Sequence, residues 1–153
     1  MGSNSAARKF CILIMAFALD PRLAADTIHV ASLAMSELLI MNDVRYPWAI
    51  LVPRIEGARE LYDLLGDDGA KVCVEIMTIA RAIGIWPGVE KVNIGALGNV
   101  VPQLHIHIIG RHARDPAWPG PVWGHSARVA YQNGAEAEFV TYLGGRKPLT
   151  QRR

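Results

Sequence analysis

The segment Gln103–Ile109 reads Gln-Leu-His-Ile-His-Ile-Ile, and its alternation of polar and apolar residues constrains the fold more than any other feature. In a β-strand, successive side chains point to opposite faces. The side chains expected on one face are polar: Gln103, His105 and His107. The side chains expected on the other face are apolar: Leu104, Ile106 and Ile108. The alternation therefore predicts a sheet whose strand buries one face and presents hydrogen-bonding groups on the other.

Other parts of the chain predict the rest of an α+β fold. The apolar runs Glu37–Asn42 and Trp48–Val52 are separated by turn residues and are typical of antiparallel neighbours. Apolar residues at i, i+3, i+4 and i+7 predict a helix over Asp68–Ile83, and Gly84 ends it. Val89–Gly95 is predicted to be another strand.

The composition indicates one globular domain. The chain has 153 residues, of which 51% are hydrophobic and 20% charged, so wholesale disorder is excluded. The formal net charge of +2 gives no reason to expect a nucleic-acid partner. Cys11 and Cys73 have no CxxC partner, and we predict buried free thiols in a reducing cytoplasm.

We expect a disordered tail over residues 1–9, a single domain over 10–143 and a basic tail over 144–153. Phe10–Leu19 is uncharged and apolar but shorter than the roughly 20 residues that span a bilayer, so no membrane association is predicted. Its basic flank has the outline of a signal peptide, although Leu23 makes a poor cleavage site. The favoured interpretation is a buried N-terminal strand or short helix in a cytoplasmic protein.

The segment Ala113–Trp123 contains three prolines and two tryptophans, which excludes regular structure. It is too aromatic for a disordered linker, so we expect it to fold back over the domain. Trp118 and Trp123 are interpreted as packing residues rather than ligand-stacking ones.

His105 and His107 are the candidate functional residues. An unperturbed imidazole, with a pKa of about 6.5, can act as a base or nucleophile near neutral pH. The glycines and asparagines between Asn93 and Asn99 form a turn that could hold phosphate oxygens. Two such histidines could also bind zinc, but no Cys, Asp or Glu lies nearby in sequence to complete a site. A purely structural role for both histidines is the remaining alternative.

From Asn93-Ile-Gly95 to Gly110-Arg111, the chain resembles the histidine triad (HIT) superfamily, whose signature alternates three histidines with apolar residues. Gln103 stands at the place of the first histidine. The sequence His-Ile-Ile-Gly-Arg matches the family's ending after its third histidine, which places the middle one at His105. A register with His107 in the middle is the alternative. The resemblance extends back to about Glu37.

The resemblance implies a HIT-like antiparallel sheet with one main helix, which dimerises into a continuous sheet. It also implies a hydrolase that attacks the α-phosphate of a nucleotide conjugate through a nucleotidyl-histidine and releases a nucleoside monophosphate. Phosphoramidates and dinucleoside polyphosphates are the candidate substrates, and no cofactor or metal is implied. The alternatives are a non-catalytic nucleotide-binding or regulatory module and a nucleotidyl transferase.

The resemblance also assigns roles to residues. His105 would attack phosphorus, His107 and Asn99 would hold oxygens, and Gln103 would orient the substrate or His105. Asp43 would accept hydrogen bonds from ribose hydroxyls. The residues implied in nucleotide binding are Asn42, Asp43, Asn93, Asn99 and His107. One departure from the family is the Arg54-Ile-Glu sequence, which stands where Lys-Lys-His is usual.

Overall fold

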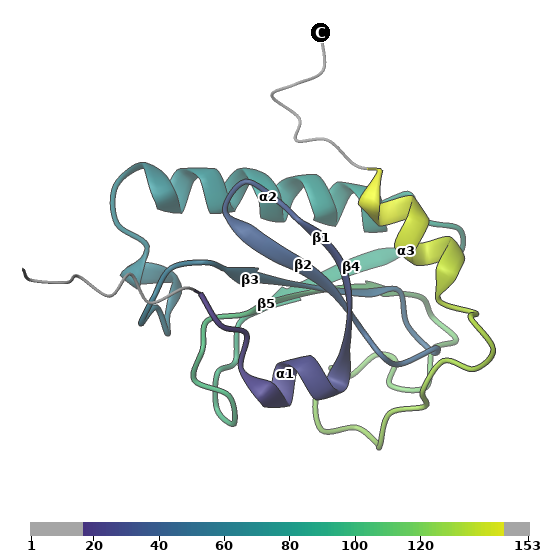
Figure 1. The fold of residues 1–153 in the computed structure, drawn as a ribbon. Helices are drawn as coiled ribbons and strands as arrows, with labels where there is room; N and C mark the ends of the chain where they lie inside the picture. The colour runs from purple at the N-terminus through teal and green to yellow at the C-terminus, as the bar shows by residue number, and fades with distance from the viewer. Residues whose placement is uncertain (1–16, 146–153) are drawn as a thin grey trace, which may run out of the picture.

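The computed structural model describes residues 17–145, and its strands form one antiparallel sheet in the order β1-β2-β3-β5-β4 (Figure 1). The strands are β1 (Thr27–Ser32), β2 (Ser36–Met41), β3 (Trp48–Pro53), β4 (Lys91–Gly95) and β5 (Ile106–Arg111). The helices are α1 (Pro21–Asp26), α2 (Asp67–Gly84) and α3 (Ala137–Gly144), with a 3-10 turn at Leu61–Asp63. The predicted α+β class is therefore confirmed.

Helices α2 and α3 lie on one side of the sheet, and α1 lies on the other (Figure 1). On the α2 side, Leu104, Ile106 and Ile108 belong to a buried cluster with residues of β2 and β3. Helix α2 contributes Ile79 and Ile83 to the same cluster, and its first turn carries acidic residues that favour a helix N-terminus. The apolar face predicted for the histidine strand is thus confirmed.

A second buried cluster covers the opposite face of the sheet. Ile50 and Ile109 contribute from the sheet, and Leu23 contributes from α1. Val101 and Val122 close this cluster from the loops before and after β5. The face that carries the histidines is therefore covered by α1 and by the loops before and after β5, which together can enclose a site.

The proline-rich segment after β5 is anchored by a buried ion pair. Arg111 Nε lies 2.7 Å from Asp115 Oδ2, and the two side chains are 1% and 0% exposed. Arg111 also donates to the carbonyl oxygen of Gly120 at 3.0 Å. As predicted, the segment contains turns rather than regular structure and folds back on the domain.

The structure corrects several boundaries and one burial prediction. The strand predicted from Gln103 begins only at Ile106, and the strand predicted from Val89 begins at Lys91. Strand β1 and helix α3 were not predicted. Cys73 is a free, exposed thiol rather than a buried one, because it lies beside the buried stripe of α2.

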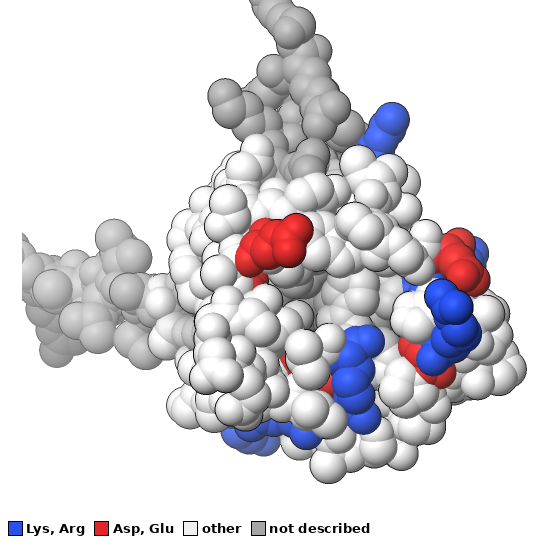
Figure 2. Space-filling model, turned by 90° about the vertical axis from the view of Figure 1, so that its right-hand side faces the viewer, with Lys and Arg blue, Asp and Glu red and all other residues white. Residues whose placement is uncertain are grey.

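Several expectations lie outside the described residues. They concern residues 1–9, most of Phe10–Leu19, Cys11 and the tail beyond residue 145. Within residues 17–145, no helix is long and apolar enough to cross a membrane. On the face shown in Figure 2, Lys and Arg side chains lie in small groups, interspersed with acidic ones, around an uncharged hollow.

Candidate active site

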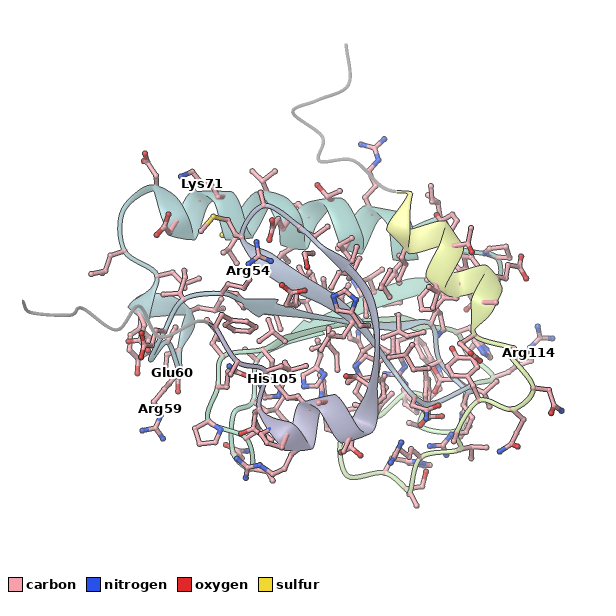
Figure 3. All side chains as sticks on the ribbon, viewed as in Figure 1. Arg54, Arg59, Glu60, Lys71, His105 and Arg114 are labelled. Atoms are coloured by element: carbon pink, nitrogen blue, oxygen red, sulfur yellow. The ribbon has the colours of Figure 1, made fainter. Side chains whose placement is uncertain are left out.

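His105 lies just before β5 on the sheet face that α1 covers, away from α2 (Figure 3). Its Nδ1 lies 2.7 Å from the carbonyl oxygen of Gln103. A carbonyl oxygen can only accept a hydrogen bond, so Nδ1 must carry the proton. In the neutral form of the ring, this contact leaves the lone pair of Nε2 for a bound molecule.

His107 is held in the opposite tautomer. Trp48 Nε1 lies 3.0 Å from His107 Nδ1. Because an indole N–H can only donate, His107 Nδ1 must accept, and the ring proton lies on Nε2. The two imidazole rings are 4.9 Å apart between centroids. One histidine thus offers a lone pair to the site, and its neighbour offers an N–H.

Burial keeps His107 uncharged. Removal from water, together with the nearby His105, lowers the pKa of His107 to about 3. A neutral imidazole that has already used Nδ1 can donate a hydrogen bond from Nε2 near neutral pH. It has no second proton to transfer to a leaving group under these conditions.

Both histidines line a cavity of about 440 Å³. Gly98 and Asn99, from the turn before β5, and Trp123, from the loop after β5, also line this cavity. Gly98 has a φ of +64°, a conformation that suits glycine and lets the chain reverse at the rim. The complete lining is Asp26, Met41, Asp43, Arg45, Tyr46, Trp48, Leu97, Gly98, Asn99, Val100, Val101, His105, His107, Val122, Trp123, Gly124, Ser126 and Arg128.

Asp43 lies in this cavity, and Arg45 holds it. The guanidinium of Arg45 donates from Nε to Oδ1 at 2.8 Å and from Nη2 to Oδ2 at 2.6 Å. Burial alone would raise the pKa of Asp43, but the hydrogen bonds from Arg45 outweigh it and the pKa is lowered. Asp43 is therefore a fixed carboxylate that can accept from hydroxyl groups with its remaining lone pairs.

The other two asparagines assigned to nucleotide binding do not line the cavity. Asn42 Oδ1 accepts from the backbone N–H of Tyr131 at 2.9 Å. Asn93 Oδ1 accepts from Arg111 Nη1 at 2.7 Å. Both side chains thus support loops around the site, whereas Asn99 lines the cavity itself.

Gln103 does not line the cavity of His105 and His107. The residue precedes β5, so strict alternation does not apply to it, and its side chain turns toward the chain before α1. It lines a second cavity, of about 510 Å³, together with Phe17 and Ala18. Of the three polar residues predicted for this face, the two histidines line the first cavity and the glutamine lines the second.

Two tryptophans of the cavity were missed as site residues. Trp48 was assigned only to an apolar strand, although it sets the tautomer of His107. Trp123 packs edge-to-face with Trp48 and His107, with centroid distances of 6.4 and 5.7 Å. Its packing role was predicted, but its place in the cavity wall was not, because the fold of the preceding prolines decides it.

The described residues do not contain a ready metal centre. Among residues 17–145, no three His, Cys, Asp or Glu side chains gather as a group that could hold a metal ion. What the site offers is an imidazole lone pair, an imidazole N–H, an asparagine and a fixed carboxylate.

Comparison with protein families matches residues 23–114 to the HIT domain. The chain belongs to this family. HIT domain proteins are generally nucleotide-binding hydrolases or transferases, so a nucleotide-binding role follows at the level of the family. A comparison with curated proteins found no match.

Solved structures agree with this assignment. The chain is 42% identical to a histidine triad protein of Bradyrhizobium japonicum, with a TM-score of 0.81 over 84% of this chain and 96% of that one. It is 39% identical to a histidine triad protein of Sinorhizobium meliloti, with a TM-score of 0.82 over 86% and 97% of the two chains. A third, from Marinobacter aquaeolei, is 42% identical, with a TM-score of 0.81 over 84% and 93%.

Proposed function

We propose that the protein is a nucleotidyl hydrolase that attacks the α-phosphate of a nucleotide conjugate through His105 and releases a nucleoside monophosphate. The observation that supports this most directly is the pair of opposite tautomers. The Gln103 carbonyl leaves His105 with an Nε2 lone pair, and Trp48 leaves His107 with an Nε2 proton. Phosphoryl transfer needs both a nucleophile and a donor for the developing charge on oxygen.

The reaction would proceed in two displacements. His105 Nε2 attacks phosphorus, the P–N bond forms and the bond to the leaving group breaks with its electron pair. The resulting nucleotidyl-histidine keeps its Nδ1–H bonded to the Gln103 carbonyl. Water then attacks the same phosphorus, loses a proton to solvent, and the P–N bond breaks to return neutral His105. An imidazole suits both steps because it is a good nucleophile and a good leaving group.

His107 would act as a hydrogen-bond donor in both steps. Its Nε2–H can hold a non-bridging oxygen of the phosphate, and Asn99, which lines the same cavity, can add a second neutral donor. Because burial lowers its pKa to about 3, His107 does not protonate the leaving group. That proton comes from the substrate or from water.

The remaining polar groups of the cavity would hold the nucleoside. Asp43 keeps lone pairs for ribose hydroxyls while Arg45 fixes its orientation. Met41 and Trp123 offer apolar and aromatic surface to a base. The groups of mixed charge in Figure 2 favour a small-molecule partner over a nucleic acid on that face.

The proposal includes a homodimer formed through β4. This strand ends the sheet, and only its β5 side is paired among the described strands. Ile94 is 48% exposed and Leu97 is 41% exposed near this edge. An unpaired edge with apolar residues is suited to continuing a sheet into a second copy. Light scattering coupled to size exclusion should report twice the mass of one chain, and a monomer would contradict this part.

The enzymatic part is tested by incubating the protein with an adenosine phosphoramidate and with diadenosine polyphosphates while AMP is followed. Wild type should release AMP, and His105→Ala should lose that release while it still binds AMP. The control variant is Tyr62→Phe, which changes an exposed tyrosine outside the cavity and should keep full activity.

The same assay separates the alternatives. AMP binding without turnover by wild type would indicate a binding or regulatory module. That outcome has a structural basis, since Gln103, at the place of the family's first histidine, does not line the cavity. Phosphate-dependent formation of ADP would indicate a transferase.

A further inference from the structure

The side chain of Gln103 is bonded to the main chain that precedes α1. Its Oε1 accepts from the backbone N–H of Asp20 at 2.8 Å, and its Nε2 donates to the carbonyl oxygen of Ala18 at 2.8 Å. An amide that accepts and donates along one backbone segment fixes both the distance and the direction of that segment. The amide therefore acts as a clamp between two parts of the chain that are far apart in sequence.

The other end of the same residue holds the candidate nucleophile. The carbonyl oxygen of Gln103 accepts from His105 Nδ1 at 2.7 Å. The backbone of Gln103 thus orients the imidazole, while its side chain holds the segment before α1. One residue links the segment before α1 to the orientation of His105.

The clamped segment also supports the turn that forms the cavity wall. Asp20 caps α1, since its Oδ1 accepts from the backbone N–H of Arg22 at 2.8 Å, and it pairs with the Arg22 guanidinium at 2.9 Å. Arg22 Nη1 then donates to the carbonyl oxygen of Val100 at 2.8 Å. Val100 and its neighbour Asn99 line the cavity. The contacts therefore run from Gln103 through Asp20 and Arg22 to the cavity wall.

Charge and burial support the same arrangement. The hydrogen bonds from Arg22 lower the pKa of Asp20 to about 2. Asp20 is therefore ionised at neutral pH. Leu23 is 5% exposed in the same core cluster as Val101, so the segment packs on the site as well as bonding to it.

We propose that Gln103 is a positioning residue whose side-chain amide clamps Ala18–Arg22 and thereby holds the cavity wall at Asn99 and Val100 against His105. The role does not require Gln103 to contact substrate. This inference rests on the proposed function only in the measurements of KM and kcat, which require turnover. Loss of the clamp should widen the cavity and weaken nucleotide binding, while the chemistry of His105, held by a backbone carbonyl, is largely retained.

The first test is Gln103→Met, which keeps the length and the backbone carbonyl but loses both amide groups. Hydrogen exchange should become faster in the peptides that contain Asp20 and Val100. The Kd of AMP and the KM of a phosphoramidate should rise about fivefold or more, with kcat within about twofold of wild type. Gln132→Met changes an exposed glutamine in the same way and should leave all these quantities unchanged.

The second test is rescue by Gln103→Glu. A protonated carboxylic acid has one donor and one acceptor, like the amide, whereas a carboxylate only accepts. The Kd of AMP for Gln103→Glu, divided by the wild-type value at the same pH, should fall toward one as the pH is lowered to about 3.5, below the ordinary glutamate pKa of about 4.3. It should rise toward the Gln103→Met ratio by about pH 7.5, once the carboxyl has ionised.

Three results would overturn the inference. Unchanged exchange at Asp20 in Gln103→Met would show that the clamp does not hold the segment. A fall in kcat with constant KM would place Gln103 at the reacting atoms. A pH-independent Kd ratio for Gln103→Glu would exclude the donor and acceptor pattern. Absence of turnover in wild type would overturn only the proposed function, because hydrogen exchange and AMP affinity do not depend on turnover.

Discussion

Trp48 and His107 are joined across β3 and β5 by a buried hydrogen bond of 3.0 Å from the indole N–H to Nδ1. The rings also pack edge-to-face, with centroids 5.6 Å apart. This single contact leaves His107 with a proton on Nε2, which is the form that can donate to a phosphate oxygen. The proposed chemistry of the site therefore depends on a tryptophan that need not contact the reacting atoms.

Replacement of Trp48 tests this dependence. Trp48→Phe keeps an aromatic ring but removes the donor, so His107 can place its proton on either nitrogen. We expect kcat/KM to fall about tenfold, in line with one lost hydrogen bond. Nitrogen NMR of the imidazole should show a mixture of tautomers. Trp118→Phe, outside the cavity, is the control, and an unchanged tautomer with unchanged activity would contradict the role given to Trp48.

The low pKa of His107 predicts how stability depends on pH. An unfolded histidine takes up a proton near pH 6.5, whereas folded His107 does so only near 3. Between these values the unfolded chain binds more protons, so the free energy of unfolding falls as the pH is lowered below about 6.5. At pH 5 the loss should be about 2 kcal/mol relative to neutral pH. Urea titrations of wild type and His107→Gln should show that the variant lacks this part of the slope; equal slopes would contradict the prediction.

The ion pair between Arg111 and Asp115 should be essential to stability. Asp115→Ala leaves a buried guanidinium without its partner, and such a loss costs about 3–5 kcal/mol. The matched control is Asp68→Ala, which removes an exposed pair with Lys71 and should change the unfolding free energy by less than about 1 kcal/mol. Similar losses in the two variants would show that burial of the first pair carries no special cost.

Much of the fold could be predicted because the core elements carry strong periodic patterns. Strands β2 and β3 and helix α2 lie within a few residues of their predicted bounds, since burial fixes their apolar residues. Strand β1 was missed because it is an edge strand with half-exposed residues and no clear alternation. Helix α3 was missed because it is short and has only two buried residues, Phe139 and Leu143.

The site could be predicted in part for a similar reason. The alternation predicts His105 and His107 on the same face, and both line the cavity. It does so because β5 and the residue directly before it determine where these two side chains point. The contacts of Gln103 and Trp123 depend on segments that are distant in sequence. No local pattern shows that residues 18–20 lie against Gln103, or that the Pro-rich segment brings Trp123 beside His107.

Gly95 tests how closely Trp123 must approach the histidines. Gly95 pairs with His107 in the sheet, and a Cβ at this position would lie 2.9 Å from Cη2 of Trp123. Gly95→Ala should push the indole out of place and raise the KM for nucleotide substrates several-fold. Gly84→Ala meets its nearest atom at 3.5 Å, an ordinary contact, and should be tolerated. An unchanged KM and unchanged tryptophan fluorescence in Gly95→Ala would show that Trp123 does not shape the cavity.

The central claim is that His105 forms a bond to phosphorus. The most direct measurement mixes the protein rapidly with a diadenosine polyphosphate, quenches in base, where phosphoramidates survive, and maps the added mass by peptide mass spectrometry. We expect one adenylyl group on the imidazole of His105 in the peptide that contains this residue, and no adenylyl group on the same peptide from His105→Ala. AMP release by wild type without a labelled His105, or with the label on His107, would contradict it.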